Sequence, residues 1–237
     1  MNEPDLPVGA AVAGWTGAAF PHRDAMSGRF SRLEPLAFKD HADDLFGAFS
    51  EDREGILWTY MPVGPFSSRD EFSKWLDSAC ASSDPSFYAI VDFSTGKATG
   101  VAAFMRINPD IGVIEIGNIT YSPALQKTAA ATEAMFLMLS RVFDELGYRR
   151  CEWKCDSLNA ASRRAAERLG FSFDGLFRQA LVYKNRNRDT AWYSIIDGDW
   201  PELKSAYEKW LEPTNFDERG RQRQKLQELM ATTGKFP

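Results

Sequence analysis

The chain has 237 residues and a near-average composition, with 44% hydrophobic and 26% charged residues. This length fits one domain or two small ones with an ordinary core, and the composition excludes a disordered chain. The net charge of −5 argues against a general binder of nucleic-acid backbones. Two histidines and three cysteines leave few ligand sets for zinc, so we expect no metal.

The odd cysteine count and the lack of a secretory signal at the start favour a reducing, cytoplasmic setting. No window of roughly 18 apolar residues occurs, so no membrane-spanning helix is expected.

Strands are predicted where polar and apolar residues alternate, and helices where apolar residues recur every three or four positions. In chain order, the expected elements are an arm over 1–28, a strand over 29–37, helices over 39–49 and 68–81, and strands over 87–93, 99–107 and 113–121. A helix over 129–146, a strand over 149–155, a helix over 159–169, strands over 171–183 and 190–196, and helices over 201–211 and 218–230 follow. We divide the chain into an arm (1–28), one folded domain (29–200) and a C-terminal helical tail (201–237).

The segment from Tyr121 to Ala134 joins a strand to the longest helix through small residues. Free amides at a helix start attract anions, and small side chains let a phosphate approach them. The alternative is an alanine-rich helix start that is capped by Thr128 and binds nothing.

Glu115 lies in an otherwise apolar strand. Burial would raise its pKa and make it a proton acceptor near neutral pH, whereas the alternation also allows its side of the strand to face solvent.

Asn159 and Gly170 are a natural N-cap and a natural left-handed stop for the helix between them. In the functional alternative, Asn159 offers its amide to a ligand and Ser162 lies near the reacting centre. Trp58 and Tyr60 either line an acceptor pocket or cover the core.

The order of these elements resembles the GNAT (Gcn5-related) N-acetyltransferase superfamily over roughly 29–200. Within it, the chain is similar to the RimJ/RimL-like group that acetylates ribosomal-protein N-termini, through 115–117, 126–131, 159–162 and 169–171. The resemblance implies an α+β fold with a mixed, mostly antiparallel central sheet, helices on both faces, and fourth and fifth strands that splay apart.

The resemblance also implies acetyl-CoA as the acyl donor and assigns site residues. The family's Q/R-x-x-G-x-G/A loop, whose amides hold the pyrophosphate, corresponds to Gln126, Lys127, Thr128, Ala129, Ala130 and Ala131. The family's bulged fourth strand corresponds to Glu115 through Tyr121 and would border the pantetheine cleft, with an amide near Ile119 facing the thioester carbonyl. Glu115 would be the base, and Asn159 would contact the pantetheine arm.

Three departures from the family pattern bear on the site. Both loop glycines are alanines, which narrows the approach of a phosphate. The strand has one residue more than usual between Glu115 and Pro123, which leaves the bulge and the facing of Glu115 open. Ala166 stands where many members have a tyrosine acid, so Ser162 or a water would protonate the leaving thiolate.

We therefore expect an enzyme that moves an acetyl group from acetyl-CoA to a primary amine, either a peptide N-terminus or a small amine, by direct transfer in a ternary complex. The alternatives for the function are a non-catalytic acyl-CoA-binding regulatory module and a structural dimerisation protein. For the donor, the alternative is another acyl-CoA such as succinyl-CoA, and for the oligomeric state it is a homodimer.

Overall fold

One eight-stranded sheet runs through the computed structural model, which describes residues 6–231. Its strands are β1 (Met26–Ser27), β2 (Ser31–Pro35), β3 (Ser86–Asp92), β4 (Lys97–Asn108), β5 (Val113–Tyr121), β6 (Arg150–Asp156), β7 (Ser172–Tyr183) and β8 (Arg186–Ile196). The spatial order is β1-β2-β3-β4-β5-β6-β8-β7, and every neighbouring pair is antiparallel except β5 and β6, which are parallel. The expected mixed, mostly antiparallel sheet is confirmed.

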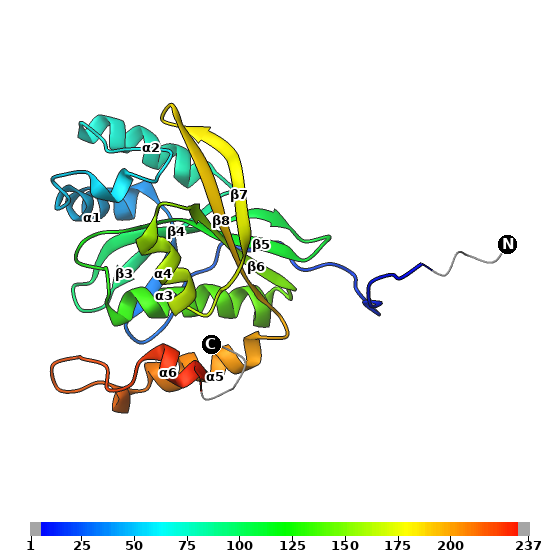
Figure 1. Cartoon of the computed structure of the whole chain (residues 1–237). Helices are drawn as coiled ribbons and strands as arrows, with labels where there is room; N and C mark the ends of the chain where they lie inside the picture. The colour runs from blue at the N-terminus through cyan, green and yellow to red at the C-terminus, as the bar shows by residue number, and fades with distance from the viewer. Residues whose placement is uncertain (1–5, 232–237) are drawn as a thin grey trace.

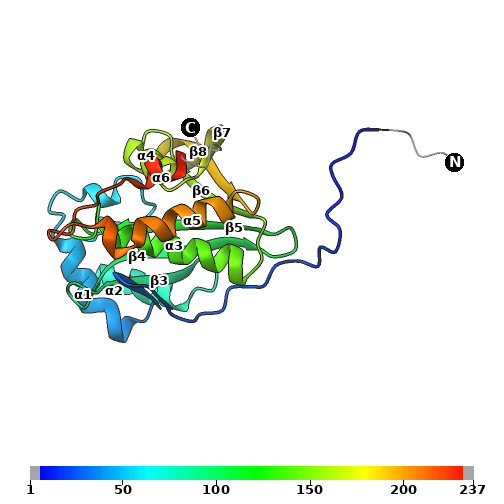
Figure 2. The same ribbon diagram turned by 90° about the horizontal axis from the view of Figure 1, so that it is seen from below.

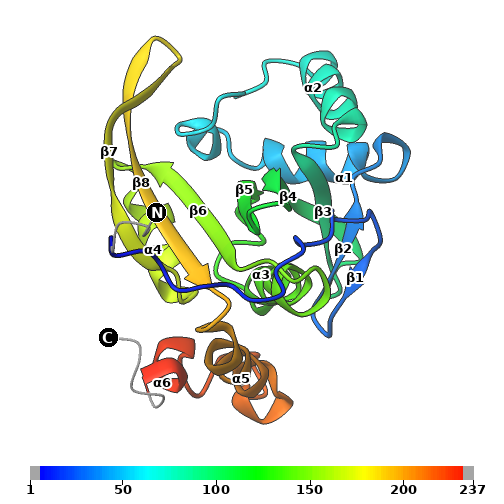
Figure 3. The same ribbon diagram turned by 90° about the vertical axis from the view of Figure 1, so that its right-hand side faces the viewer.

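Helices cover both faces of this sheet (Figures 1 and 3). They are α1 (Phe38–Ser50), η1 (Ile56–Trp58), α2 (Arg69–Ala81), α3 (Ala129–Ser140), η2 (Arg141–Glu145), α4 (Ala160–Arg168), α5 (Trp200–Leu211), η3 (Pro213–Asn215) and α6 (Leu226–Ala231). The helix expected over 129–146 thus ends in a π-helical turn, η2, before Gly147 takes a positive φ of 74°.

Two hydrophobic clusters follow from the alternation along the central strands. Tyr88 and Ile90 of β3 join a cluster with α3, α4 and α5, whereas Phe87, Ala89 and Val91 of the same strand join a cluster with α1 and α2. Successive side chains of a strand point to opposite faces, so a strand that is apolar at every position requires cover on both sides. The sequence pattern of β3 therefore dictates the three-layer arrangement.

The segment expected to be a free arm is partly built into the fold. Met26 and Ser27 form β1 and pair with β2. Farther back, the Trp15 indole nitrogen donates to the carbonyl oxygen of Asp110 at 2.8 Å, and the amide of Ala18 donates to the carbonyl oxygen of Pro109 at 2.9 Å. Figure 2 shows the segment before these contacts leading away from the sheet.

The C-terminal segment is less helical than expected. The expected helix over 218–230 is shorter, because helix α6 spans only Leu226–Ala231. The Asp217 carboxylate accepts from the amides of Arg219 and Arg221, both at 2.9 Å, and Gly220 has a φ of 72°. These local bonds compete with a helix and hold a turn instead.

A buried carboxylate of α3 fixes the turn between β1 and β2. The Glu133 carboxylate, 3% exposed, accepts from the amides of Arg29 and Phe30 at 2.7 Å and of Ser31 at 2.8 Å. A Cβ atom at Gly28 would collide with the same carboxylate. One charged acceptor therefore satisfies three backbone donors of the turn, and the missing side chain of Gly28 leaves room for it.

We predict that Glu133→Ala lowers the free energy of unfolding by about 3 kcal/mol, because buried donors that lose their acceptor cost about 1–3 kcal/mol each. Urea unfolding followed by fluorescence measures this change. Glu145→Ala is the matched control, since Glu145 is half-exposed and pairs only with Arg141 in the same helical region. It should cost less than about 1 kcal/mol. Equal losses in the two variants would contradict the prediction.

Candidate active site

The strands β5 and β6 part soon after they begin to pair. Their register joins Val113 with Arg150, Ile114 with Cys151, and Glu115 with Glu152, and it stops there. β5 continues to Tyr121, while β6 stays paired with β8 up to Asp156. The second half of β5 consequently has one edge without a strand partner, and Figure 3 shows the two strands running apart. These are the fourth and fifth strands of the prediction, which were expected to splay.

A bulge bends β5 in the half that leaves β6. Gly117 pairs with Ala103 and Thr120 with Val101, so Asn118 and Ile119 both lie opposite Ala102 of β4. Asn118 has a φ of 50°, in the left-handed region. A bulge of this kind inserts one residue and increases the bend and twist of its strand.

Glu115 lies where β5 and β6 part, and its side chain is 3% exposed. Its Oε2 atom lies 2.7 Å from Nη1 of Arg106 on β4 and 3.0 Å from Nζ of Lys154 on β6. The Oε1 atom faces Gly117, where an added Cβ would come within 3.1 Å of it. One carboxylate oxygen is therefore anchored by two cations, and the other faces Gly117, two residues farther along β5. The strand is apolar in sequence, but the site around Glu115 is charged.

Lys154 connects two acidic side chains. Its side chain is 8% exposed, and Nζ lies 2.6 Å from a carboxylate oxygen of Glu152 in addition to its contact with Glu115. The same ammonium stands 3.8 Å from the ring centroid of Trp192 on β8, within the range of a cation–π interaction. Glu152 also binds Arg150 at 2.9 Å. Burial by itself raises the pKa of Glu152, but the hydrogen bonds and charges of Lys154 and Arg150 outweigh it and hold this pKa below its ordinary value.

Lys154 and Glu152 were not among the predicted site residues, although the sequence carries a signal for them. Charged residues alternate with buried apolar ones in the order Arg150, Cys151, Glu152, Trp153, Lys154. This period of two places the three charged side chains on one face of β6. Only the pairing of β6 with β5 shows that this face meets Glu115.

The start of α3 is capped as expected. The Thr128 hydroxyl accepts from the amide of Ala131 at 3.1 Å. Before the helix, the amide of Gln126 donates to the carbonyl oxygen of Ser122 at 3.1 Å, and the amide of Thr128 to that of Leu125 at 3.3 Å. These bonds wind the loop tightly, and they use three of the six amides of the expected pyrophosphate loop.

The other three amides of the loop, those of Lys127, Ala129 and Ala130, have no acceptor among the described residues. Lys127 has a φ of 62° and an exposed side chain. Ala130 and Ala131 are buried in the core, and Ala129 packs against it. Ala129 and Ala131, which stand at the positions of the family's two loop glycines, therefore turn their methyl groups to the core. This limits how far they narrow the approach of an anion to the amides. The positive end of α3 thus carries three amides without an acceptor among the described residues, as an anion site requires.

Asn159 and Ser162 are linked to each other and to the sheet. Asn159 Oδ1 accepts from the amide of Ser162 at 3.0 Å and so caps α4, and the Ser162 hydroxyl accepts from the indole nitrogen of Trp153 at 3.0 Å. Trp153 alternates with Glu152 and Lys154 along β6, so Ser162 lies on the face of the sheet opposite Glu115. The structure does not bring the two expected catalytic side chains together on one face.

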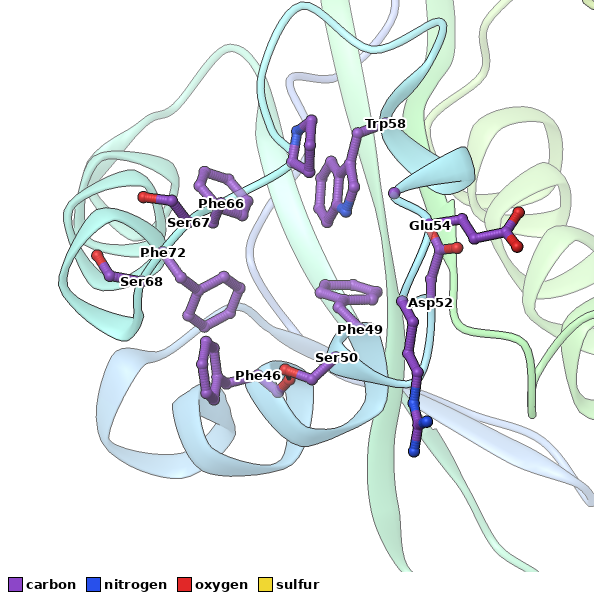
Figure 4. Close-up of a pocket in the computed structure, with 13 residues that line it drawn as sticks. Phe46, Phe49, Ser50, Asp52, Glu54, Trp58, Phe66, Ser67, Ser68 and Phe72 are labelled. Atoms are coloured by element: carbon purple, nitrogen blue, oxygen red, sulfur yellow. Dashed lines mark hydrogen bonds between the residues drawn. The ribbon is translucent and has the colours of Figure 1, made fainter.

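The two aromatic residues expected at the acceptor side differ in their surroundings. The Trp58 ring is 3% exposed and packs with ring centroids 5.3 Å from Phe49 and 5.0 Å from Phe66. This cluster borders a pocket of about 380 Å³ between α1, α2 and their connecting loop (Figure 4). The Tyr60 hydroxyl instead donates to the carbonyl oxygen of Leu158 at 3.2 Å, next to the start of α4. Trp58 is thus a packing residue, whereas Tyr60 connects the loop to the α4 region.

The turn between β7 and β8 holds the same loop. Lys184 Nζ donates to the carbonyl oxygens of Trp58 at 2.7 Å, Gly64 at 2.8 Å and Val63 at 3.4 Å. Partial burial lowers the pKa of Lys184. A single side chain therefore joins the loop between α1 and α2 to a hairpin about 120 positions later in the chain.

Two further observations apply to residues 6–231. No group of three or more His, Cys, Asp or Glu side chains in this part is arranged to hold a metal ion. No helix in it is long and apolar enough to cross a membrane.

The chain matches known acetyltransferases in sequence and in structure. Residues 32–172 match the family model described as an acetyltransferase (GNAT) domain. A GCN5-related N-acetyltransferase from Brucella melitensis superposes with a TM-score of 0.91 at 50% identity, over 93% of this chain and 100% of that one. The enzyme from Salmonella typhimurium that modifies the N-terminal serine of ribosomal protein L7/L12 shares the fold, with a TM-score of 0.63 at 19% identity over 73% of this chain and 99% of that one.

An uncharacterized N-acetyltransferase of Bacillus subtilis (strain 168), YnaD, is 28% identical over 86 residues. This match covers 36% of the present chain and 50% of the length of that relative. Together with the splayed strands and the helix start beside them, the match over residues 32–172 shows that this chain belongs to the GNAT family of acyl-CoA-dependent N-acetyltransferases.

Proposed function

We propose that this enzyme moves an acetyl group from acetyl-CoA to a primary amine, either a peptide N-terminus or a small amine, by direct transfer in a ternary complex. The observation that carries the proposal is the parting of β5 and β6 at Glu115, in the segment that leads directly into the free amides of α3. A buried carboxylate and a helix start with free amides thus lie at the two ends of one strand and its following loop, and this supports the proposal.

The donor side uses mainly backbone groups. The amides of Lys127, Ala129 and Ala130 would bind the pyrophosphate, because they are free and lie at the positive end of a helix. The unpaired edge of β5 from Ile119 to Tyr121 would border the pantetheine arm. Asn159 uses its carbonyl oxygen in the helix cap, so its side-chain amide nitrogen is the group left to contact that arm.

The chemistry requires a base, an oxyanion contact and an acid. Glu115, through Oε1 and directly or through a water, would take a proton from the acceptor ammonium, after which the amine attacks the thioester carbonyl carbon. The amide near Ile119 would stabilise the oxyanion, and the carbon–sulfur bond then breaks. The leaving thiolate would take its proton from a water, because Ser162 lies on the opposite face of the sheet from Glu115. An α-amino group has a pKa of about 8 and lysine about 10.4, so an N-terminal amine is easier to deprotonate.

The acceptor side would be formed by the loop between α1 and α2 and by the β7–β8 hairpin. Lys184 and Tyr60 connect this loop to the hairpin and to the residues before α4. Loops that are held at both ends present side chains with less loss of entropy when a ligand binds. We therefore assign acceptor selection to this bridged region.

A thiol-release assay over peptides, polyamines and aminoglycosides tests the proposed reaction. The peptide set should include one with an N-terminal serine, because the Salmonella relative modifies such a residue. Coenzyme A release that depends on an amine, with the acetylated amine found by mass spectrometry, is the expected result. Acetyl-CoA binding without release for any amine would instead support a non-catalytic acyl-CoA-binding module.

We predict that Glu115→Gln lowers kcat by about 100-fold or more, because the amide cannot accept the ammonium proton. The Kd for acetyl-CoA should change little, since the donor contacts lie at the start of α3. Steady-state kinetics and calorimetric titration measure the two effects separately. Glu51→Gln, which removes an exposed carboxylate at the end of α1, serves as the control. Unchanged turnover across the pH range would remove Glu115 from the role of base.

A second prediction concerns the anion site. Lys127→Asp should weaken acetyl-CoA binding by about tenfold, because a carboxylate beside the free amides repels the pyrophosphate. The same charge interacts favourably with the helix dipole, so Tm should stay the same or rise. Lys127→Asn is the matched control, since both replacements tolerate a positive φ and only one adds a negative charge. An equal loss of affinity in both variants would assign the effect to the lysine charge alone.

The bridge to the acceptor loop gives a third prediction. Lys184→Met should accelerate hydrogen exchange over residues 55–66 by about tenfold, because the loop loses a charged donor worth about 1.5 kcal/mol. Exchange in α3 should not change. Lys97→Met, at the exposed turn between β3 and β4, is the control. Exchange over 55–66 that equals the wild type would show that the aromatic cluster around Trp58 holds the loop by itself.

A further inference from the structure

Two buried carboxylates face each other across the point where β5 and β6 part. Glu115 and Glu152 are partners in the parallel register and lie on the same face, with exposures of 3% and 7%. Like charges on directly neighbouring positions of two strands repel, and burial strengthens the repulsion because water no longer screens it. A cation that contacts both carboxylates offsets this repulsion most directly.

Lys154 is the cation that contacts both. Its Nζ atom lies 3.0 Å from Glu115 and 2.6 Å from Glu152, and the Trp192 ring covers it from β8. We propose that Lys154 is a positioning residue of the acetyl transfer: it offsets the repulsion between Glu115 and Glu152 and holds Oε2 of Glu115, which leaves Oε1 facing Gly117. The inference rests on the proposed role of Glu115 as base.

The other charged groups around Glu115 do not replace Lys154. Arg106 of β4 binds the same Oε2 atom, but its side chain is 52% exposed, so solvent screens its charge more strongly. Arg150 of β6 contacts Glu152 and, at 2.6 Å, Asp174 of β7, and it makes no ion pair with Glu115. The Cys151 thiol is buried, and its pKa is raised well above its ordinary value, so it brings no charge.

Removal of Lys154 would leave Arg106 on Glu115 and Arg150 on Glu152, but it would remove the one cation that contacts both carboxylates. Their repulsion would then favour the uptake of a proton by the pair at neutral pH. A proton held between Glu115 and Glu152 stops Glu115 from accepting one from the ammonium. Raising the pH removes that proton and restores the base. The effect of the substitution thus depends on pH, and it depends on Glu152 being acidic. A purely structural role of Lys154 predicts neither dependence.

The kinetic test compares kcat/KM across pH for four proteins, with the best amine of the thiol-release panel. In Lys154→Met, the acid limb should move upward by about 1–3 pH units, with activity at pH 7 about tenfold or more below wild type. In Lys154→Met combined with Glu152→Gln, the limb should return toward the wild type. Lys204→Met is the control, because Lys204 pairs with Asp144 on the surface and should leave the profile unchanged. The same acceptor amine is used with all four proteins, so its own titration affects the four pH profiles equally.

A loss of activity in Lys154→Met that is the same at every pH would overturn the proposal, and so would the failure of Glu152→Gln to restore the limb. If the wild type acetylates no amine, the proposed function fails instead, and the inference is then judged by a readout that needs no acceptor. Carbon NMR of protein labelled at the glutamate carboxyl carbon follows each titration directly. A carboxyl group that titrates near neutral pH should appear in Lys154→Met and disappear in the double variant. Its absence in folded Lys154→Met would contradict the inference.

Discussion

The short parallel pairing of β5 and β6 is the constraint on which the site depends. Three residues on each strand pair, and the bulge at Asn118 and Ile119 then bends β5 while β8 keeps β6 straight in the sheet. The divergence leaves unpaired backbone groups at the centre of the protein, which are costly unless a ligand or water satisfies them. The same strand leads without a long connection into α3, whose first amides are also free. Under the proposed function, donor recognition would follow from backbone geometry, which alanines at the positions of the family's glycines leave in place.

The buried charges at the divergence perform a different task. A lone carboxylate with 3% exposure would cost several kcal/mol or take up a proton. Arg106 and Lys154 offset that cost from the two neighbouring strands, and both contact a single oxygen. The arrangement stabilises a charge and also aims it, because the second oxygen is left facing Gly117. Stabilisation and orientation are therefore supplied by the same contacts, and a substitution at Lys154 changes both.

Local signals in the sequence predicted the elements well where the bonds are local. Ser68 caps α2 by accepting from the amide of Glu71 at 3.2 Å, as the S-x-x-E spacing indicates. Thr128 and Asn159 cap α3 and α4 in the same way. Predictions failed at the turn around Asp217, where local side-chain hydrogen bonds compete with a helix. They also failed where an element depends on a residue that is far away in the chain. β1 is such a case, because its turn depends on Glu133, about 100 positions away in the chain.

The sequence alone determined the order of the elements, the capped start of α3 and the presence of one carboxylate in β5. These follow from the periodicity of apolar residues and from caps that span three or four residues. Only the tertiary structure decided which way that carboxylate points, what neutralises it, and that Ser162 lies on the opposite face. Each of these depends on register and strand pairing, which join residues that no local pattern relates. Lys184 and the loop it holds belong to the same class, since their contacts close the fold across 120 positions of the chain.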